Sequence, residues 1–458
     1  MEVADPDLAD SSDSGSLRWR RAVRGGLTGG VGRAVALLLS LAVTPIAINR
    51  AGSTTYGLFA ALTAFATLLA FSDFGVGNGV IRDLVAARAR SGAPGADPEG
   101  ANAVDDEGPI TATALLVLIV LGLVVTAIGA VAAFTLPWQT LLKAPTADAR
   151  SLRFAVLAVA VSTGFAVPGA LAQKIYLARQ RSAQASLWAA AAGAVGSVAL
   201  FIVVLGNHRL TLMVGAQLGA PALVGIVALW WLARTRTVSF KADQISFAVV
   251  KTLVKSGRLF AVLQFVAIIN FEVDNLIVAR LLGPAKVTQF AVTAGLFAIP
   301  LTISAMFFTP LWSAFADAVA VHDVEWVRTA YRRSTRNALV VLIPTAAVLA
   351  VVARPAVHIW TRGAVHSPEL LVVAFSVWLV VYGFNQPQAM LLNALHAERF
   401  QIWAASANLV VNLTLSIVLT QAFGVSGVIW GTEIAQSGVL TATTVYLRRW
   451  NANWPTAR

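Results

Sequence analysis

The sequence predicts an all-α polytopic membrane protein, with about twelve transmembrane helices arranged as two six-helix bundles. Of its 458 residues, 57% are apolar and only 12% are charged, whereas soluble proteins carry roughly a quarter charged residues. The mean hydropathy is +0.74. Apolar runs of about 20 residues, each long enough to cross ~30 Å of hydrocarbon, recur along the whole chain.

The apolar runs between polar breaks give the expected helices in order. They cover residues 27–49, 57–81, 110–136, 154–173, 184–206, 211–233, 259–282, 288–313, 337–360, 370–395, 401–423 and 426–447. The segments between them are too short to form a globular domain. The longest outer segment, at about 137–153, leaves little room for catalysis outside the membrane, so we do not expect an enzyme.

The loops differ in their content of Lys and Arg. With the N-terminus inside, the cytoplasmic segments hold more than twice as many basic residues as the outer loops. Because basic residues are enriched in cytoplasmic loops, both termini are expected on the cytoplasmic side of a bacterial-type cytoplasmic membrane. The same distribution explains the net charge of +12 without nucleic-acid binding.

Composition also predicts how the chain is divided. The N-terminal segment carries aspartates among serines and has too little apolar content to fold. The expected parts are a disordered acidic tail at 1–17, an N-terminal six-helix bundle at 18–233, a basic cytoplasmic linker at 234–258, a C-terminal six-helix bundle at 259–447 and a cytoplasmic tail at 448–458.

The two bundles would both start from the cytoplasm, so a duplication would relate them by an axis along the membrane normal. A few identities at one fixed offset support such a parallel repeat. Gly52, Phe59 and Ala60 at the first helix junction recur as Gly283, Phe290 and Ala291 in the second half. A twelve-helix chain with two six-helix halves is most often a transporter.

Three junction segments carry a family resemblance. Residues 51–60 read AGSTTYGLFA, residues 71–82 read FSDFGVGNGVIR, and residues 274–283 read DNLIVARLLG. These segments resemble the "LGxxxYGxFA", "DxGxxxAxxR" and "DxxIIGxxLG" junctions of the lipid-linked polysaccharide and O-antigen flippases, a family of the multidrug/oligosaccharidyl-lipid/polysaccharide exporter superfamily. The chain departs from those patterns at Ala51, Gly79 and Val278-Ala279.

The resemblance implies a flippase for surface polysaccharide biosynthesis. Such a protein moves a polyprenyl-diphosphate-linked oligosaccharide to the outer leaflet by ion-coupled alternating access, with membrane lipid around it and a proton or sodium ion as the coupling ion. We expect a monomer without a cofactor. A multidrug extrusion antiporter of the same superfamily is an alternative, and an integral membrane polysaccharide polymerase or glycosyltransferase is an alternative of another class.

Acidic residues inside an apolar span are candidates for ion coupling. One charged residue at the centre of a transmembrane helix costs about 2.5–3.5 kcal/mol, so it normally faces a polar interior. At 100° per residue, Asn270 and Asp274 share one face, whereas Glu272 lies on nearly the opposite one. We expect Asp274, Glu272, Asn270 and Asp73 to take part in ion coupling. A buried polar contact between helices is the alternative.

Cationic residues near the cytoplasmic side are candidates for binding the diphosphate. These are Arg33, Arg82 and Arg258. Asn78 is a further candidate because it shares a helix face with Arg82, and Arg280 is a candidate near the outer end. Anchoring at the membrane surface is the alternative for each arginine.

Disulfides, thiolate metal sites and cysteine nucleophiles are excluded because the chain has no cysteine. Its five histidines are scattered without metal-binding spacing, so no metal site is expected.

Overall fold

The computed structural model of the protein describes residues 32, 34–69, 73–91, 101–235, 237–395 and 397–453. Within these ranges the chain forms helices and turns and no strands, as the sequence predicts. Nine of the described helices are long and apolar enough to cross a membrane. The protein is therefore a multi-pass membrane protein, and the number twelve stays a prediction. The acidic tail expected at 1–17 lies outside the described residues.

The helices follow one another with short connections. In chain order they are a helix over Ala34–Ala51, α2 (Ser53–Leu69), α3 (Val76–Ser91), α4 (Ala101–Thr135), α5 (Trp138–Leu141), α6 (Ala149–Ala178), α7 (Ser182–Gly206), α8 (Leu210–Val214), the π-helix η3 (Gly215–Gly219), α9 (Ala220–Arg234), the 3₁₀ helix η4 (Ala242–Gln244), α10 (Phe247–Leu282), α11 (Pro284–Ala320), α12 (Val324–Trp360), α13 (Glu369–Ala394), α14 (Glu398–Phe423) and α15 (Val425–Asn453).

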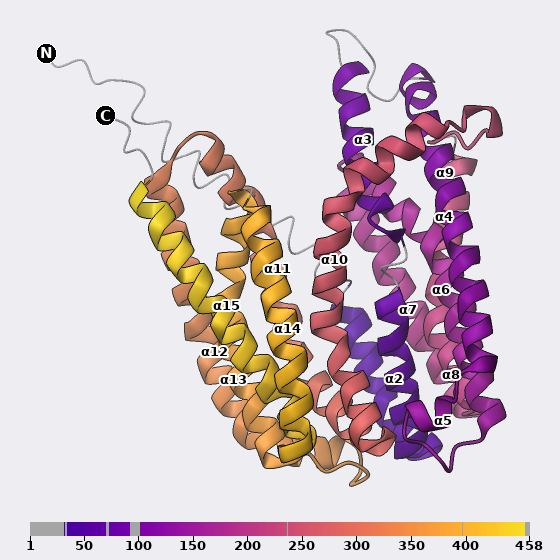
Figure 1. The fold of residues 1–458 in the computed structure, drawn as a ribbon, viewed down its shortest axis with the longest axis vertical. Coiled ribbons are helices and arrows are strands. Elements are labelled where there is room, and N and C mark those ends of the chain that lie inside the picture. The colour runs from indigo at the N-terminus through magenta and orange to yellow at the C-terminus, as the bar shows by residue number, and fades with distance from the viewer. Residues whose placement is uncertain are drawn as a thin grey trace, which may run out of the picture.

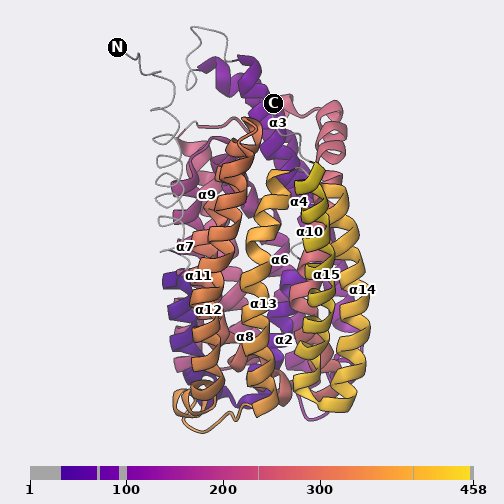
Figure 2. The same cartoon turned by 90° about the vertical axis from the view of Figure 1, so that its left-hand side faces the viewer.

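The helices gather in two groups, with α10 between them (Figure 1). We call residues 34–234 the N-lobe and α11 to α15 the C-lobe. In Figure 2, α12 to α15 form a layer of nearly parallel helices in front of the N-lobe. The lobes lie close together at the end of the molecule with α5 and diverge toward the end where α3 and α15 terminate (Figure 1). Since α10 packs on α2 and α3 in one lobe and on α14 in the other, it joins the two.

The helix expected at 57–81 is divided into α2 and α3, and residues 70–72 between them lie outside the described part. The division has a local cause. Phe74 and Gly75 adopt left-handed backbone conformations, with φ of 45° and 75°. Asp73 Oδ1 accepts a hydrogen bond from the backbone N–H of Gly75 at 3.0 Å, which stabilises the turn. This turn places Asp73 inside the N-lobe instead of along a continuous helix.

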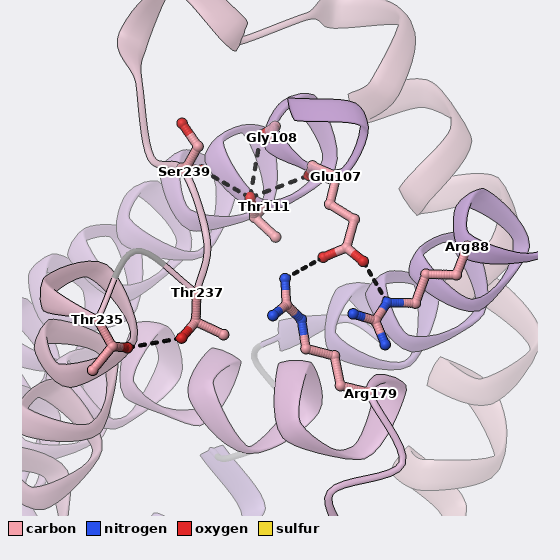
Figure 3. A network of polar contacts seen from close by, with 8 residues as sticks. All are labelled: Arg88, Glu107, Gly108, Thr111, Arg179, Thr235, Thr237 and Ser239. Atoms are coloured by element: carbon pink, nitrogen blue, oxygen red, sulfur yellow. Dashed lines mark hydrogen bonds and ion pairs between the residues drawn. The ribbon is translucent and has the colours of Figure 1, made fainter. Parts of the chain in front are cut away.

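Helix α10 begins at Phe247, inside the range expected as a linker. The segment before it is fastened to α4 of the N-lobe. Thr111 Oγ1 donates to the carbonyl oxygen of Ser239 at 2.9 Å (Figure 3), and the backbone N–H of Ser246 donates to Thr113 Oγ1 at 3.1 Å. The start of α10 is therefore attached to the N-lobe.

Three elements of the N-lobe meet at Glu107 in α4 (Figure 3). Its carboxylate accepts from Arg88 Nε on α3 and from a guanidinium nitrogen of Arg179, which caps the C-terminus of α6, each at 2.5 Å. The side chain of Glu107 is only 2% exposed. Two cations offset the cost of burying one carboxylate, so these ion pairs hold the ends of α3, α4 and α6 together.

Candidate functional site

A cluster of polar side chains, which we call the Asp274 cluster, lies where α10 meets α14 and α15. It consists of Asn270, Asp274, Asn408, Asn412, Ser416 and Thr432. Asn270 and Asp274, predicted to share one face of their helix, both bond to these neighbouring helices. Asn270 Oδ1 accepts from Asn408 Nδ2 at 2.7 Å, and Asp274 Oδ2 accepts from Thr432 Oγ1 at 3.0 Å.

The close approach of α14 and α15 assembles one side of this cluster. A Cβ atom on Gly431 would lie 2.4 Å from the backbone nitrogen of Ser416, so only glycine fits there. The neighbouring Thr432 consequently reaches Asn412 Oδ1 at 3.1 Å, and Ser416 donates to the same oxygen at 2.7 Å.

Asp274 receives a single hydrogen bond in this cluster, and Asn412 Nδ2 has no acceptor among the described residues. The single hydroxyl hydrogen of Thr432 is shared between Asp274 Oδ2, Asn412 Oδ1 and the carbonyl oxygen of Val428. Asp274 is only 4% exposed, and its Oδ1 has no hydrogen-bond partner among the described residues. A buried carboxylate with an unpartnered oxygen is stabilised by a proton or a small cation, so Asp274 stays a candidate for the predicted ion coupling.

Glu272 lies on α10 near Asp274 but differs in burial. Its side chain is only half-buried, whereas that of Asp274 is buried. A second fully buried acid of this region is Glu433 on α15, which is 3% exposed and has no hydrogen-bond partner for either carboxylate oxygen among the described residues.

A second polar site is a cavity of about 540 Å³ inside the N-lobe, which we call the N-lobe cavity. Its walls come from α2, α6, α7, η3 and α9, with Gln264 from α10. Its polar and aromatic lining consists of Thr67, Asp73, Ser162, Thr163, Gln173, Lys174, Trp188, Gln217 and Gln264.

A chain of hydrogen bonds crosses one side of the N-lobe cavity. Lys174 Nζ on α6 donates to Asn78 Oδ1 on α3 at 3.1 Å, and Asn78 Nδ2 donates to Gln264 Oε1 on α10 at 3.4 Å. Asp73 interacts electrostatically with Lys174. A Cβ atom on Gly77 would lie 2.9 Å from Asp73 Oδ2 and 3.0 Å from Lys174 Cε, which shows that both side chains converge there.

The predicted arginines do not gather in one place within the described part of the chain. Arg82 is exposed on α3. Arg280 is exposed near the end of α10, where Nη1 donates to the carbonyl oxygen of Thr140 at 3.3 Å. Arg33 lies outside the described residues. Arg258 lies on α10, but its side chain is outside what the structure describes.

The structure adds residues that sequence reasoning missed. The predicted helix 154–173 ended one position before Lys174, whereas α6 continues to Ala178 and so places Lys174 in the cavity wall. A signal for Asn408 and Asn412 was present, because two amides four residues apart share one face of an apolar helix. Glu433 was visible as a charge within an expected span. No group of three or more metal-ligating side chains occurs in the described ranges.

The arrangement of the helices is that of transporters of the MOP superfamily. An inward-facing multidrug resistance MATE family transporter of that superfamily shares 15% sequence identity, with a TM-score of 0.73 over 93% of this chain and 100% of that chain. An outward-facing one gives 14% identity and a TM-score of 0.65 over 96% of this chain and 97% of that chain. A MOP superfamily transporter from Pyrococcus furiosus shares 15% sequence identity, with a TM-score of 0.64 over 96% of this chain and 97% of that chain.

The family follows from the sequence itself. The family model described as "Polysaccharide biosynthesis protein" matches residues 23–315, which is more than half of the chain. The chain belongs to this family, as the junction motifs indicated. No curated protein matches it by sequence.

Proposed function

We propose that this protein is a flippase for surface polysaccharide biosynthesis, which moves a polyprenyl-diphosphate-linked oligosaccharide from the inner to the outer leaflet of the cytoplasmic membrane. Membership of the polysaccharide biosynthesis family and the MOP transporter fold support this proposal. Both are properties of transporters and not of enzymes. The observation that carries the proposal is the burial of Asp274 on α10, the helix that contacts both lobes.

Ion coupling needs a charged group that a bound ion can neutralise and a helix whose packing changes when that happens. Asp274 supplies the charge, and its contacts to α14 and α15 attach α10 to the C-lobe. A proton or sodium ion at Asp274 would change how strongly α10 is held by the C-lobe. A ligand shifts a conformational equilibrium only by binding one state more tightly, and a cluster built from separate helices provides such a difference.

The substrate has a polar head that must cross ~30 Å of hydrocarbon, while its polyprenyl tail can stay in lipid. In the expected topology, Arg33, Arg82 and Arg258 lie toward the cytoplasmic side, where the head enters. Arginine suits this task because its planar fork of donors can bind a phosphate through two hydrogen bonds. Arg280 would contact the head near the outer side.

A multidrug antiporter of the same superfamily is the second candidate. Buried acids such as Asp73 and Asp274 favour it, since organic cations need negative partners. The cavity lining discriminates between the two, because a diphosphate carrier needs a cation in contact with its substrate. Lys174 in the N-lobe cavity favours the flippase.

The test compares the two acids of α10 in a flippase-deficient strain. We expect Asp274→Asn to lower surface polysaccharide per inserted protein by roughly 5- to 150-fold, the range that typical coupling free energies of 1–3 kcal/mol produce. Glu272→Gln should have a smaller effect, because Glu272 is only half-buried. The lipid-linked precursor should accumulate inside the cell when export fails.

Both variants must insert at wild-type levels for the comparison to hold. Normal polysaccharide export by Asp274→Asn would remove Asp274 from the coupling mechanism. Failure of the wild-type chain to restore export, together with resistance to cationic drugs in the same cells, would favour the antiporter.

A further inference from the structure

The N-lobe cavity contains a cation with unused hydrogen-bonding capacity. A lysine ammonium group has three donors, and Lys174 uses one of them on Asn78. The neighbouring Asp73 directs Oδ1 to the backbone N–H of Gly75, so one of its oxygens is occupied by the turn. Lys174 therefore has two donors left for an anion in the cavity, which would compete with the charge of Asp73 for them.

The remaining lining suits a ligand rich in hydroxyl groups. Gln173, Gln217 and Gln264 offer amide groups, and the hydroxyls of Ser162 and Thr163 lie on the same wall. Amides and hydroxyls both donate and accept hydrogen bonds, as sugar hydroxyls do. Trp188 adds a flat apolar surface with a polar edge.

The size of the cavity limits what it can hold. Its volume of about 540 Å³ lies within the roughly 300–1,000 Å³ of pockets that take drug-sized ligands. It therefore has room for a diphosphate with its first sugar, and the rest of a long oligosaccharide would extend beyond it.

We propose that the N-lobe cavity binds the anionic, hydroxyl-rich head of the lipid-linked substrate, with Lys174 holding the phosphate. Binding would take Lys174 away from Asn78 and so free Asn78 and Gln264 for new partners. This inference rests on the proposed function, since that function supplies the substrate class.

The position of Gln264 gives this binding site a path to the Asp274 cluster. Gln264 and Asp274 lie on the same helix, separated by roughly 15 Å at 1.5 Å per residue. A head group that breaks the contact between Asn78 and Gln264 would loosen α10 from α3. The same helix carries the proposed coupling acid about three turns further along.

The test measures binding to the purified full-length protein, without transport. The probes are farnesyl diphosphate, inorganic diphosphate, farnesol and phosphatidylglycerol, and the measurements are calorimetry and native mass spectrometry. We expect farnesyl diphosphate to bind, and Lys174→Gln to weaken it by at least about tenfold, since a hydrogen bond to a charged group is worth roughly 1.5–3 kcal/mol. Lys174→Arg should retain part of the affinity. Lys286→Gln is the control, because Lys286 is exposed at the start of α11.

A double variant separates binding from folding. Buried Asp73 interacts electrostatically with half-buried Lys174, so removing one charge leaves the other unbalanced, whereas removing both is often nearly neutral for stability. Asp73→Asn combined with Lys174→Gln should therefore unfold at the wild-type temperature and still fail to bind farnesyl diphosphate. Recovery of binding in the double variant would overturn the role of Lys174.

The other outcomes are also decisive. Binding of farnesyl diphosphate by Lys174→Gln within about twofold of wild type would overturn the proposal, as would equal binding of farnesol. Equal binding of phosphatidylglycerol would assign the site to bulk lipid and would also overturn it, whereas inorganic diphosphate that binds through Lys174 would support it as the head without its tail. A wild-type chain that binds the probe through Lys174 without restoring export would refute the proposed function and leave the site intact.

Discussion

Glu107, Asp274 and Glu433 are all buried, but their charges are balanced in three different ways. Glu107 has an arginine on each carboxylate oxygen. Asp274 accepts one hydrogen bond, from the hydroxyl of Thr432, which also contacts Asn412. Neither oxygen of Glu433 has a hydrogen-bond partner in the described ranges. A fully paired acid stabilises one arrangement, whereas an acid with oxygens to spare can gain a proton or an ion. On this basis we infer a structural role for Glu107, and we keep Asp274 as the proposed residue of ion coupling.

Glu107→Gln should destabilise the N-lobe strongly. The substitution leaves two guanidinium groups near each other without a counter-charge, and breaking a buried pair in this way costs about 3–5 kcal/mol. The measurement is the unfolding temperature in detergent. Glu369→Gln is the matched control, because its pair with Arg354 is exposed, at 77% and 54%, and exposed pairs contribute about 1 kcal/mol or less. Equal unfolding temperatures for the two variants would contradict this role of Glu107.

Site residues could be predicted from the sequence where their arrangement depends on neighbours in the same helix, and not where it depends on contacts between distant helices. Helical periodicity was enough to put Asn270 and Asp274 on one face. Their partners, Asn408 and Thr432, come from helices more than a hundred residues away, and nothing local specifies which helices meet. Lys174 was missed because a lysine at the end of an apolar run looks like a membrane anchor. Only the folded lobe shows that it lines a cavity.

At the scale of elements, α10 packs against helices of both lobes. Its first half packs backbone against backbone at the start of α3, since a Cβ atom on Gly257 would lie 2.4 Å from the carbonyl oxygen of Gly75, the residue just before that helix. Its second half bonds to α14 and α15 through Asn270 and Asp274. The apolar period of the sequence predicted this helix but not its extension back to Phe247. The break between α2 and α3 was not predicted either, because it depends on two left-handed residues.

Gly257→Ala should separate α3 from α10 and disfavour the conformation seen here. Spin labels at Val85→Cys on α3 and Thr252→Cys on α10, both exposed positions, can report the change, since the chain has no native cysteine. We expect the distance distribution between the labels to move to longer values. Gly438→Ala on α15 should leave it unchanged, because nothing lies within 4 Å of a Cβ atom there. Identical distributions in both variants would show that the crossing is not tightly packed.

At the scale of the whole molecule, two lobes that touch at one end and diverge at the other suit alternating access (Figure 1). The N-lobe cavity and the Asp274 cluster lie on different parts of this frame, and α10 contributes to both. Substrate binding and ion binding would therefore act on the same helix from opposite lobes. The parallel repeat of the two halves stays a prediction.

The orientation of this frame in the membrane is the last prediction. Because basic residues concentrate in the segments expected inside, the end of the molecule where the lobes diverge should face the cytoplasm. Single cysteines at Thr54, Asn207 and His366 should react with an impermeant thiol reagent added to intact cells. Those at Lys241 and His322 should react only after the membrane is permeabilised. All five positions are exposed in the structure, so a lack of labelling reports the membrane and not burial. The reverse pattern would place the open end outside, where a lipid-linked precursor made in the cytoplasm could not enter this conformation.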